Sequence, residues 1–255
     1  MKKIFKRNFN RKEHNSSIFE NVFILGGTSE IAKEICLSLA KSGTKRIHLV
    51  SRDSIKNKSF IDKLNNLFDL KVSSEEIDLL TYSQEKKPDV GFFDLYIIAT
   101  GYLGNINFAN NDHMEALKIA KINYYSLIPW INAILTKERI NKPGSIWILS
   151  SVAGDRGRPS NYHYGAAKAA LSIFCEGLYH RCYKKPFKVR IIKAGFVYTS
   201  MTIGKAPKFL CATTEYVAKT LIKNPFKEGV EYLPWWWAIV MKVVDLLPRS
   251  FITKL

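Results

Sequence analysis

The chain has 255 residues, of which 47% are hydrophobic and five are tryptophan, and this composition excludes a disordered polypeptide. A chain of this length can bury one sizeable core, so we expect a single domain. The formal net charge of +17 favours anionic partners: nucleic acid, a phosphorylated substrate or an anionic membrane surface. Four cysteines occur without a C-x-x-C pair, so we expect reduced thiols in an intracellular protein and no zinc or other metal site: Cys36, Cys175, Cys182 and Cys211.

The N-terminal segment is strongly basic. Six of the first fourteen residues are Lys or Arg, and no apolar stretch follows them before the first strand, so the segment is not a secretory signal. We expect residues 1–18 to form a flexible basic arm. It is either a solvated tail or an electrostatic attachment to anionic lipid, worth roughly 1 kcal/mol for each basic residue near the surface.

Short apolar runs alternate with segments of helical periodicity along the rest of the chain. We expect strands at residues 22–25, 47–50, 95–99, 145–149, 189–194 and 230–233, and helices at residues 30–41, 113–137 and 162–183. In the first helix Ile31, Ile35 and Leu39 recur every four residues and share a face. The alternation predicts an α/β fold, a Rossmann-type doubly wound parallel sheet in a single domain at residues 19–233. Such sheets bind ligands outside the carboxyl ends of their strands.

The first of these strand ends carries a glycine pair. Gly26 and Gly27 join strand 22–25 to helix 30–41. Glycine lets the backbone approach a pyrophosphate, and the helix N-terminus supplies free N–H groups. The stretch does not match G-x-G-x-x-G, so a purely structural turn is the alternative.

The second strand end carries a cation. An acidic residue at the last position of this strand would accept a ribose 2′-hydroxyl, but Ser51 holds that position and Arg52 follows it. Arg52 would meet a 2′-phosphate, which favours NADPH over NADH, and the alternative is a solvated surface arginine. Asp78, after a further strand, is a candidate for the adenine amino group or for the cap of its own turn.

The chemistry centres on Tyr164 and Lys168, which lie four residues apart and share a helix face. The small residues between them would let a cofactor lie close. A phenol has a pKa of about 10, and the nearby ammonium together with a bound nicotinamide cation would lower that pKa. Ser151, just after strand 145–149, would hydrogen-bond the same carbonyl oxygen. Tyr162 is six residues from Lys168 and faces another way, so Tyr164 is the better candidate.

Six features in the same order along the chain carry a family resemblance: GGTSEIA (26–32), IATG (98–101), KINYYS with Asn123, Ser151, Y-x-x-x-K (164–168) and AGFVYT (194–199). With them the chain resembles the short-chain dehydrogenases/reductases. The resemblance implies a catalytic triad of Ser151, Tyr164 and Lys168, with Asn123 as the fourth member. It implies that Tyr164 gives a proton to a carbonyl as hydride arrives and that Ser151 orients that carbonyl. Lys168 would hold the nicotinamide ribose, and Asn123 would support a water path to the lysine.

The resemblance also implies NADH or NADPH as the cofactor, with Thr199 bonded to the nicotinamide carboxamide. Together with Arg52 and Asp78, the expected cofactor contacts are Gly26, Thr28, Ser29, Glu30, Ile31, Ala99, Gly101, Tyr164, Lys168, Val197 and Thr199. The chain departs from the family's T-G-x-x-x-G-x-G turn, because Leu25, Glu30 and Ala32 replace the threonine and the last two glycines. Ala99-Thr100-Gly101 replaces an asparagine-rich turn, and Ala194 replaces a usual proline. These departures concern the cofactor contacts more than the fold.

A narrower resemblance extends from residue 21 to the C-terminus. The segments LGGTSEIA, ATGYLGN, AKINYYS, SSVAGDRGRPSNYHYGAAKAAL and EYLPWWWAIVMKVVDLLPRSFITKL are similar to the reductase component of decaprenylphosphoryl-ribose 2′-epimerase. This implies that a separate flavin-dependent partner oxidises the ribose 2′-hydroxyl of a polyprenyl-phosphate sugar. This chain would then reduce the 2-keto group to the arabinose epimer used for cell-envelope arabinan. The alternatives are a reductase of another carbonyl (ketoacyl, steroid or small polar ketone) and a non-catalytic dinucleotide-binding regulator.

Two features bear on a lipid phosphate substrate. Arg156 and Arg158 lie between Ser151 and Tyr164, where they either meet the phosphate or belong to a solvated loop. Residues 234–255 are expected to form a Trp-rich amphipathic helix, and the thirteen residues between its two prolines are too few to span a bilayer.

The two sides of this C-terminal helix differ in polarity. The polar side holds Ala238, Lys242, Asp245 and Arg249, and the apolar side holds Trp236, Ile239, Val240, Val243, Leu246 and Leu247. We expect the apolar side at the lipid–water boundary, with packing on the protein's own core or on a dimer mate as the alternative. The expected enzyme is cytoplasmic and peripheral on the inner face of the plasma membrane, with substrate entering beside residues 200–212. No motif supports nucleic-acid binding, and a homo-oligomer stays open.

Overall fold

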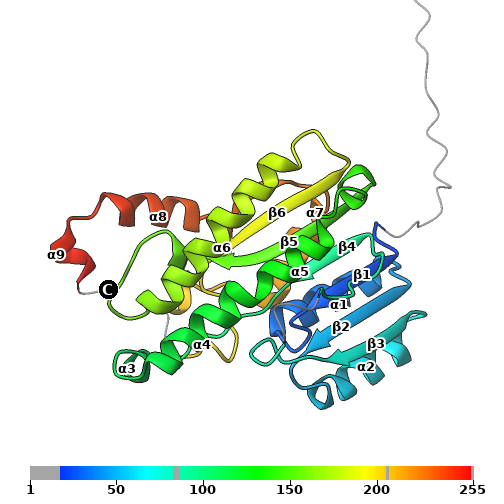
Figure 1. The fold of residues 1–255 in the computed structure, drawn as a ribbon, viewed down its shortest axis with the longest axis horizontal. Helices are drawn as coiled ribbons and strands as arrows, with labels where there is room; N and C mark the ends of the chain where they lie inside the picture. The colour runs from blue at the N-terminus through cyan, green and yellow to red at the C-terminus, as the bar shows by residue number, and fades with distance from the viewer. Residues whose placement is uncertain (1–17, 83–86, 205–206, 254–255) are drawn as a thin grey trace, which may run out of the picture.

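The computed structural model describes residues 18–82, 87–204 and 207–253. Within these ranges one parallel sheet has the strand order β3-β2-β1-β4-β5-β6-β7 (Figure 1). Its strands are β1 (Asn21–Leu25), β2 (Arg46–Ser51), β3 (Lys71–Glu76), β4 (Leu95–Ile98), β5 (Gly144–Ser151), β6 (Phe187–Ala194) and β7 (Gly229–Leu233). The order reverses between β1 and β4, so the sheet is doubly wound and the predicted fold is confirmed. The crevice at such a reversal is where these sheets bind ligands.

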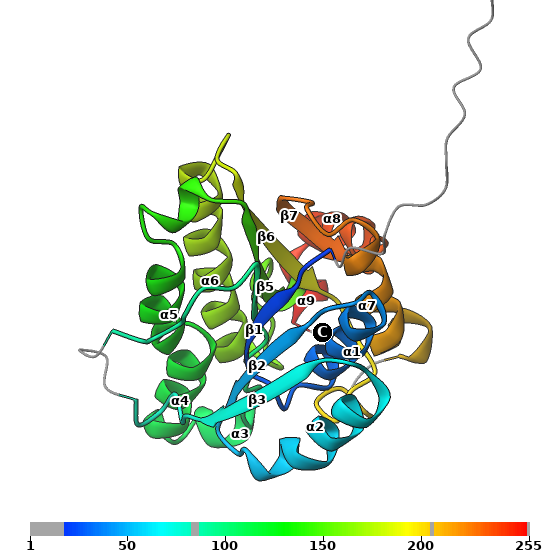
Figure 2. The same cartoon turned by 90° about the vertical axis from the view of Figure 1, so that its right-hand side faces the viewer.

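Helices cover both faces of the sheet (Figure 2). One face is packed by α1 (Glu30–Lys41), α2 (Ile55–Leu67) and α7 (Thr214–Lys223). The other face is packed by α4 (His113–Asn123), α5 (Ile128–Ile134) and α6 (Tyr162–Arg181). The short helix α3 (Ile106–Ala109) precedes α4, and α8 (Trp237–Leu246) and α9 (Arg249–Ile252) follow β7. Helices α2 and α7 lie in stretches for which the sequence predicts no element.

Local sequence patterns explain the central strands and the first helix. The central strands β4 and β5 are apolar runs because helices bury both of their faces. In α1, Ile35 and Leu39 are buried, as their four-residue spacing predicts. Ser29 caps this helix, and its hydroxyl accepts a hydrogen bond from the Ala32 N–H.

The single helix predicted at residues 113–137 is wrong. Helix α4 ends at Asn123, a 3₁₀ turn follows at Tyr125–Leu127, and α5 begins at Ile128. The buried Asn123 side chain is bonded to the backbone of Tyr102 in another loop, and the next residue leaves the helical conformation. Pro129 has no N–H to donate and therefore suits the first turn of a new helix.

The C-terminal helix α8 is shorter than the segment predicted at residues 234–255 and packs one face on the protein itself. Trp237 and Met241 are buried in a cluster with Val152. The Trp237 ring takes the place of a side chain at Gly195, where an added Cβ would lie 2.1 Å from the indole. For this face the alternative of packing on the protein's own core holds.

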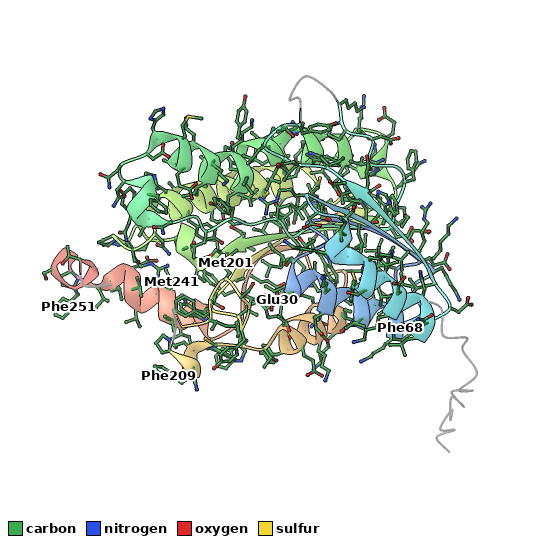
Figure 3. The ribbon with its side chains drawn as sticks, turned by 90° about the horizontal axis from the view of Figure 1, so that it is seen from below. Glu30, Phe68, Met201, Phe209, Met241 and Phe251 are labelled. Atoms are coloured by element: carbon green, nitrogen blue, oxygen red, sulfur yellow. The ribbon has the colours of Figure 1, made fainter. Side chains whose placement is uncertain are left out.

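The opposite face of α8 is apolar and open to solvent. Ile239, Val243 and Leu246 have 57%, 55% and 85% of their surface exposed. Figure 3 shows α8 and α9 extending to the side of the molecule where Phe209 also lies. Within the part of the chain that the structure describes, no helix is both long and apolar enough to cross a bilayer.

Candidate active site

A cavity of about 940 Å³ opens at the carboxyl ends of the central strands. The turn after β1, the ends of β2, β3 and β5, the loop after β4, the start of α6 and the segment after β6 line it. Every residue that the sequence assigns to catalysis or to the cofactor lines this cavity, with the exception of Asn123. The volume lies at the upper end of the range for small-molecule sites, about 300–1,000 Å³.

The turn after β1 has room only for glycine. Gly26 has a φ of +98°, and a Cβ on it would lie 2.7 Å from the Ala99 carbonyl carbon. A Cβ on Gly27 would lie 2.9 Å from the side chain of Leu49. The turn is therefore pressed onto the ends of β2 and β4, and it brings the N-terminus of α1 to the cavity wall.

Glu30, which replaces a glycine of the family turn, reaches across the cavity edge. Its Oε1 accepts a hydrogen bond of 2.7 Å from the backbone N–H of Ser200. Figure 3 shows Glu30 at the start of α1 beside the segment that carries Met201. The glycine-rich turn and the segment after β6 are thus joined through a carboxylate, a contact that no sequence pattern indicated.

The ends of β2 and β3 form the part of the cavity farthest along the sheet from β5. Ser51 is the last residue of β2, as predicted, and its buried hydroxyl accepts from Asn57 at 2.9 Å. Arg52 is exposed and makes no ion pair with any described residue, whereas Asp53 pairs with Lys56 at 3.2 Å.

Asp78 also lines this part of the cavity, and it caps its own turn. Its Oδ1 accepts a 2.9 Å hydrogen bond from the Leu80 N–H. The capping alternative is therefore observed, and contact with an adenine amino group stays a prediction.

Lys168 is buried at the centre of the site, on the second turn of α6. Only 2% of its surface is exposed. Its Nζ donates to the carbonyl oxygens of Leu149 at 3.1 Å and Thr100 at 3.3 Å, which belong to the ends of β5 and β4. Burial lowers the pKa of this ammonium to about 8. The Nζ lies 5.8 Å from the centre of the Tyr164 ring, on the same helix face.

Tyr164 keeps its proton more firmly than the sequence predicts. Burial raises its pKa to about 12, and a hydrogen bond with the Ser151 side chain opposes that rise. The Lys168 ammonium alone does not lower the pKa, and the lowering expected from the ammonium together with a bound nicotinamide cation stays a prediction. Burial dominates, and the Lys168 ammonium is engaged by the Leu149 and Thr100 carbonyls.

The packing of α6 on the turn after β5 brings Ser151 and Tyr164 together. A Cβ on Gly165 would lie 2.7 Å from the Ala153 carbonyl oxygen, so only glycine permits this approach. Ser151 ends β5, and its Oγ accepts from the Ala153 N–H at 3.1 Å. The small residues after Tyr164 thus have a second use, because they let the helix sit close to the serine.

Asn123 holds the loop after β4 and does not reach the cavity. Its Oδ1 accepts from the Tyr102 N–H at 3.1 Å. Its Nδ2 donates to the carbonyl oxygens of Tyr102 at 2.7 Å and Ile119 at 2.8 Å. The structure gives this side chain a positioning contact, and the water path to Lys168 stays a prediction.

The segment after β6 folds into a hydrogen-bonded turn on the cavity wall. Val197 forms an isolated parallel bridge with Ala212. The Thr199 N–H donates to the Thr202 hydroxyl at 3.2 Å, and the two hydroxyls lie 3.3 Å apart. Both Val197 and Thr199 line the cavity, and their contact with the cofactor stays a prediction.

Three cavity residues between Ser151 and Tyr164 carry buried polar atoms without a described partner: Arg158, Asn161 and His163. The sequence singled out Arg158 by its charge and missed the other two. Asn161 directly precedes a helix, where an asparagine is expected to cap, so the sequence contained no signal that its side chain would be left for the cavity.

A doubly wound sheet with a glycine turn at its crevice, and with serine, tyrosine and lysine gathered over it, defines a nicotinamide-dependent oxidoreductase of the short-chain class. The family model for short chain dehydrogenase matches residues 20–208. The chain therefore belongs to the short-chain dehydrogenase family and is an NAD(P)-dependent oxidoreductase.

Relatives of known sequence or structure agree with this assignment. The chain is 28% identical over 233 residues to an uncharacterized oxidoreductase of Mycobacterium tuberculosis, covering 89% of this chain and 94% of that protein. It is 26% identical over 244 residues to one from Streptomyces coelicolor, covering 92% and 95%. Among solved structures, a 3-oxoacyl-[acyl-carrier protein] reductase from Brucella melitensis superposes with a TM-score of 0.69 at 19% identity, covering 90% and 95%. A 7β-hydroxysteroid dehydrogenase superposes with a TM-score of 0.73 at 16% identity, covering 89% and 92%.

Proposed function

We propose that this enzyme reduces the 2-keto group of a polyprenylphosphoryl keto-pentose with NADH or NADPH and so forms the arabinose epimer. The observation that carries the reductive chemistry is the single cavity that holds Ser151, Tyr164 and Lys168. A protonated phenol and a serine hydroxyl on one wall suit a carbonyl oxygen that becomes a hydroxyl. A regulator that only bound a dinucleotide would need no proton donor.

The residues divide the work as follows. When bound, the nicotinamide dinucleotide supplies the hydride. Tyr164 donates its proton to the carbonyl oxygen. The phenol is protonated at neutral pH, since its ordinary pKa is already about 10 and burial raises it further, to about 12. Ser151 orients the same oxygen through its hydroxyl. Lys168 uses two N–H groups on Leu149 and Thr100 and has a third for the nicotinamide ribose.

The other cofactor contacts fit the chemistry of a dinucleotide. The turn at Gly26 and the first turn of α1 offer backbone N–H groups to a pyrophosphate. Arg52 favours NADPH, since it is a cation on the cavity wall without a counter-ion among the described residues, next to a serine instead of an acidic residue. One solved structure, from Shigella flexneri, is complexed with NADP, and one from Brucella melitensis has bound NAD. Similarity to these structures therefore does not decide between NADH and NADPH.

A lipid-linked substrate is supported by the surface beside the cavity. Trp237 Nε1 donates to the Leu210 carbonyl at 3.2 Å and so ties α8 to the segment after β6. Phe209 in that segment is 82% exposed, and α8 exposes Ile239, Val243 and Leu246 beside it in the fold. Together with the net charge of +17 and the basic first residues, this apolar surface suits an anionic membrane. We therefore place the enzyme at the cytoplasmic face of such a membrane, where the polyprenyl chain would be dissolved.

The keto group would come from a separate flavin-dependent oxidase acting on the ribosyl lipid. The test combines that oxidase, labelled polyprenylphosphoryl ribose, the purified chain and NADPH, followed by lipid analysis. Formation of the arabinosyl lipid, dependent on this chain and lost in Tyr164→Phe, is expected. Turnover of a ketoacyl or steroid substrate without turnover of the keto-pentose lipid would support the alternative of a different carbonyl reductase. Cofactor binding without turnover of any of these would support the regulator.

A further inference from the structure

The loop after β5 and the first turn of α6 bring three polar side chains to the cavity wall that the proposed chemistry does not use. Arg158 Nε, Asn161 Oδ1 and His163 Nε2 are buried and have no hydrogen-bond partner among the described residues. Buried polar groups in proteins are nearly always paired, because an unpaired one costs free energy. Three such atoms within six residues of chain, on one cavity, indicate that a ligand supplies the partners.

The charge of Arg158 is uncompensated. Asp155, three residues earlier, would be the nearest acidic partner in the sequence. Its carboxylate is taken by the Lys193 ammonium at 2.5 Å and the Tyr232 hydroxyl at 2.8 Å. Arg158 takes part in no ion pair with a described residue, and burial lowers the pKa of its guanidinium. A guanidinium in this setting suits a phosphate, to which it can donate two parallel hydrogen bonds.

The other two residues of this set, Asn161 and His163, carry hydrogen-bonding groups. Asn161 is the residue before α6, a position where asparagine normally caps the helix, yet its side chain makes no cap hydrogen bond. Its amide is therefore left for another partner. His163 Nε2 donates or accepts according to its tautomer. Such groups suit hydroxyls, which both donate and accept.

The position of these residues separates them from the adenine end of the crevice. Arg52 and Asp78 follow β2 and β3, whereas Arg158, Asn161 and His163 lie between Ser151 and Tyr164, the residues that would hold the reacting carbonyl. A ligand group bound by these three would thus be part of the substrate, attached close to the keto group.

We infer that Arg158, Asn161 and His163 form a subsite for a phosphorylated sugar, in which Arg158 binds the phosphate and the other two bind sugar hydroxyls. The inference rests on the proposed function and assigns residues to the phosphate and the sugar hydroxyls of its substrate. A steroid brings no anion to Arg158, and a ketoacyl chain brings no row of hydroxyls to Asn161 and His163.

The test is calorimetric titration of the full chain, saturated with oxidised cofactor, with ribose 5-phosphate, ribose and inorganic phosphate. The wild type should bind ribose 5-phosphate more tightly than either of the others. Arg158→Gln should weaken that binding about ten- to a hundredfold, the range for a charge-assisted hydrogen bond. Arg156→Gln is the matched control, because Arg156 lies in the same loop with the same charge but does not line the cavity. It should change the affinity by less than about twofold.

Asn161→Asp provides a second variant that keeps the fold. Aspartate is as good a helix N-cap as asparagine, and its charge in the subsite would repel the phosphate, so ribose 5-phosphate binding should be lost. The subsite would be overturned if Arg156→Gln and Arg158→Gln lost the same affinity for ribose 5-phosphate, or if the wild type did not bind ribose 5-phosphate. If the wild-type chain reduces a ketone but does not bind ribose 5-phosphate, the subsite is refuted and the proposed reductase chemistry is not. A chain that binds ribose 5-phosphate as expected but reduces no carbonyl would refute the proposed function alone.

Discussion

The backbone N–H of Ser200 donates a 2.7 Å hydrogen bond to the carboxylate of Glu30, across 170 residues of sequence. Glu30 starts α1 beside the glycine turn, and Ser200 belongs to the segment after β6. In the family pattern a glycine stands at this place in the turn. The chain has therefore exchanged a small residue at the cofactor turn for a link that holds the far wall of the cavity.

Loss of this link should weaken substrate binding. Glu30→Ala removes the acceptor for Ser200 N–H and frees the segment after β6, so KM for the carbonyl substrate should rise roughly tenfold, as for a hydrogen bond to a charged group. Glu30→Gln keeps an acceptor oxygen and should raise KM much less. Steady-state kinetics of both variants decides this. A KM in Glu30→Ala equal to that of the wild type would show that the link is incidental.

Removal of the proton donor should stop turnover and spare cofactor binding. Tyr164→Phe keeps the ring and deletes the hydroxyl, so kcat should fall by about 10²–10⁴-fold, the usual contribution of general acid–base catalysis. Fluorescence titration should show cofactor affinity close to that of the wild type. Tyr162→Phe serves as the control, because Tyr162 is exposed and its hydroxyl bonds Asn110 outside the cavity. If the two variants turn over at similar rates, the role given to Tyr164 is wrong.

Arg52 should distinguish the two cofactors. Arg52→Ala removes the cation that would meet a 2′-phosphate, so NADPH affinity should fall roughly ten- to a hundredfold while NADH affinity changes little. Calorimetry with each cofactor measures the difference. A comparable loss of affinity for NADPH and NADH would show that Arg52 does not contact the 2′-phosphate.

The buried ammonium of Lys168 should leave a signature in the pH dependence of stability. Burial lowers its pKa from 10.5 to about 8. Between these pH values the unfolded chain keeps a proton that the folded chain has released, so the free energy of unfolding gains from rising pH in this window. Below it, the folded chain carries the full cost of a buried charge.

Lys168→Met cannot titrate and should lack this gain. The stability of the wild type, relative to Lys168→Met, should therefore increase between about pH 8 and pH 10.5 in urea unfolding without cofactor. Lys63→Met, at an exposed lysine of α2, should show a constant difference from the wild type. A constant difference for Lys168→Met as well would contradict the assignment of a shifted pKa to Lys168.

The exposed face of α8 should control attachment to lipid. The Ile239→Ser/Val243→Ser/Leu246→Ser variant changes solvent-facing side chains and should fold, yet it should float less with anionic liposomes than the wild type. A chain without residues 1–14 should lose the part of the binding that is sensitive to salt. Replacement of Trp237 is uninformative here, since that residue is buried. If the wild type does not float at low salt, the apolar face serves another partner.

The fold and the shared cavity of Tyr164 and Lys168 could be predicted because their signals are local. The strands other than β3 contain apolar runs, and Tyr164 and Lys168 are spaced by one helical turn. The residues expected at the strand ends line the cavity because parallel strands end at a common edge of the sheet.

The features that the sequence did not predict depend mostly on residues far apart in the chain. The break after Asn123 depends on Tyr102, 21 residues away, and the role of Glu30 depends on Ser200. Periodicity placed Ile239, Val243 and Leu246 correctly on one exposed apolar face of α8. It could not show that Trp237 packs on Gly195, because that partner lies 42 residues earlier in the chain. The raised pKa of Tyr164 is a property of burial, which no spacing of residues reveals.

The contact of Trp237 with Gly195 also sets an order of events during synthesis. Gly195 forms part of the cavity wall, and the indole that covers it arrives 42 residues later in the chain. Strands β1 to β6 and both reacting side chains on α6 leave the ribosome before residue 237 does. A chain that ends before residue 237 therefore contains Ser151, Tyr164 and Lys168 but lacks the indole that packs on the Gly195 backbone. The full set of contacts behind this part of the cavity wall becomes available only after Trp237 has been added.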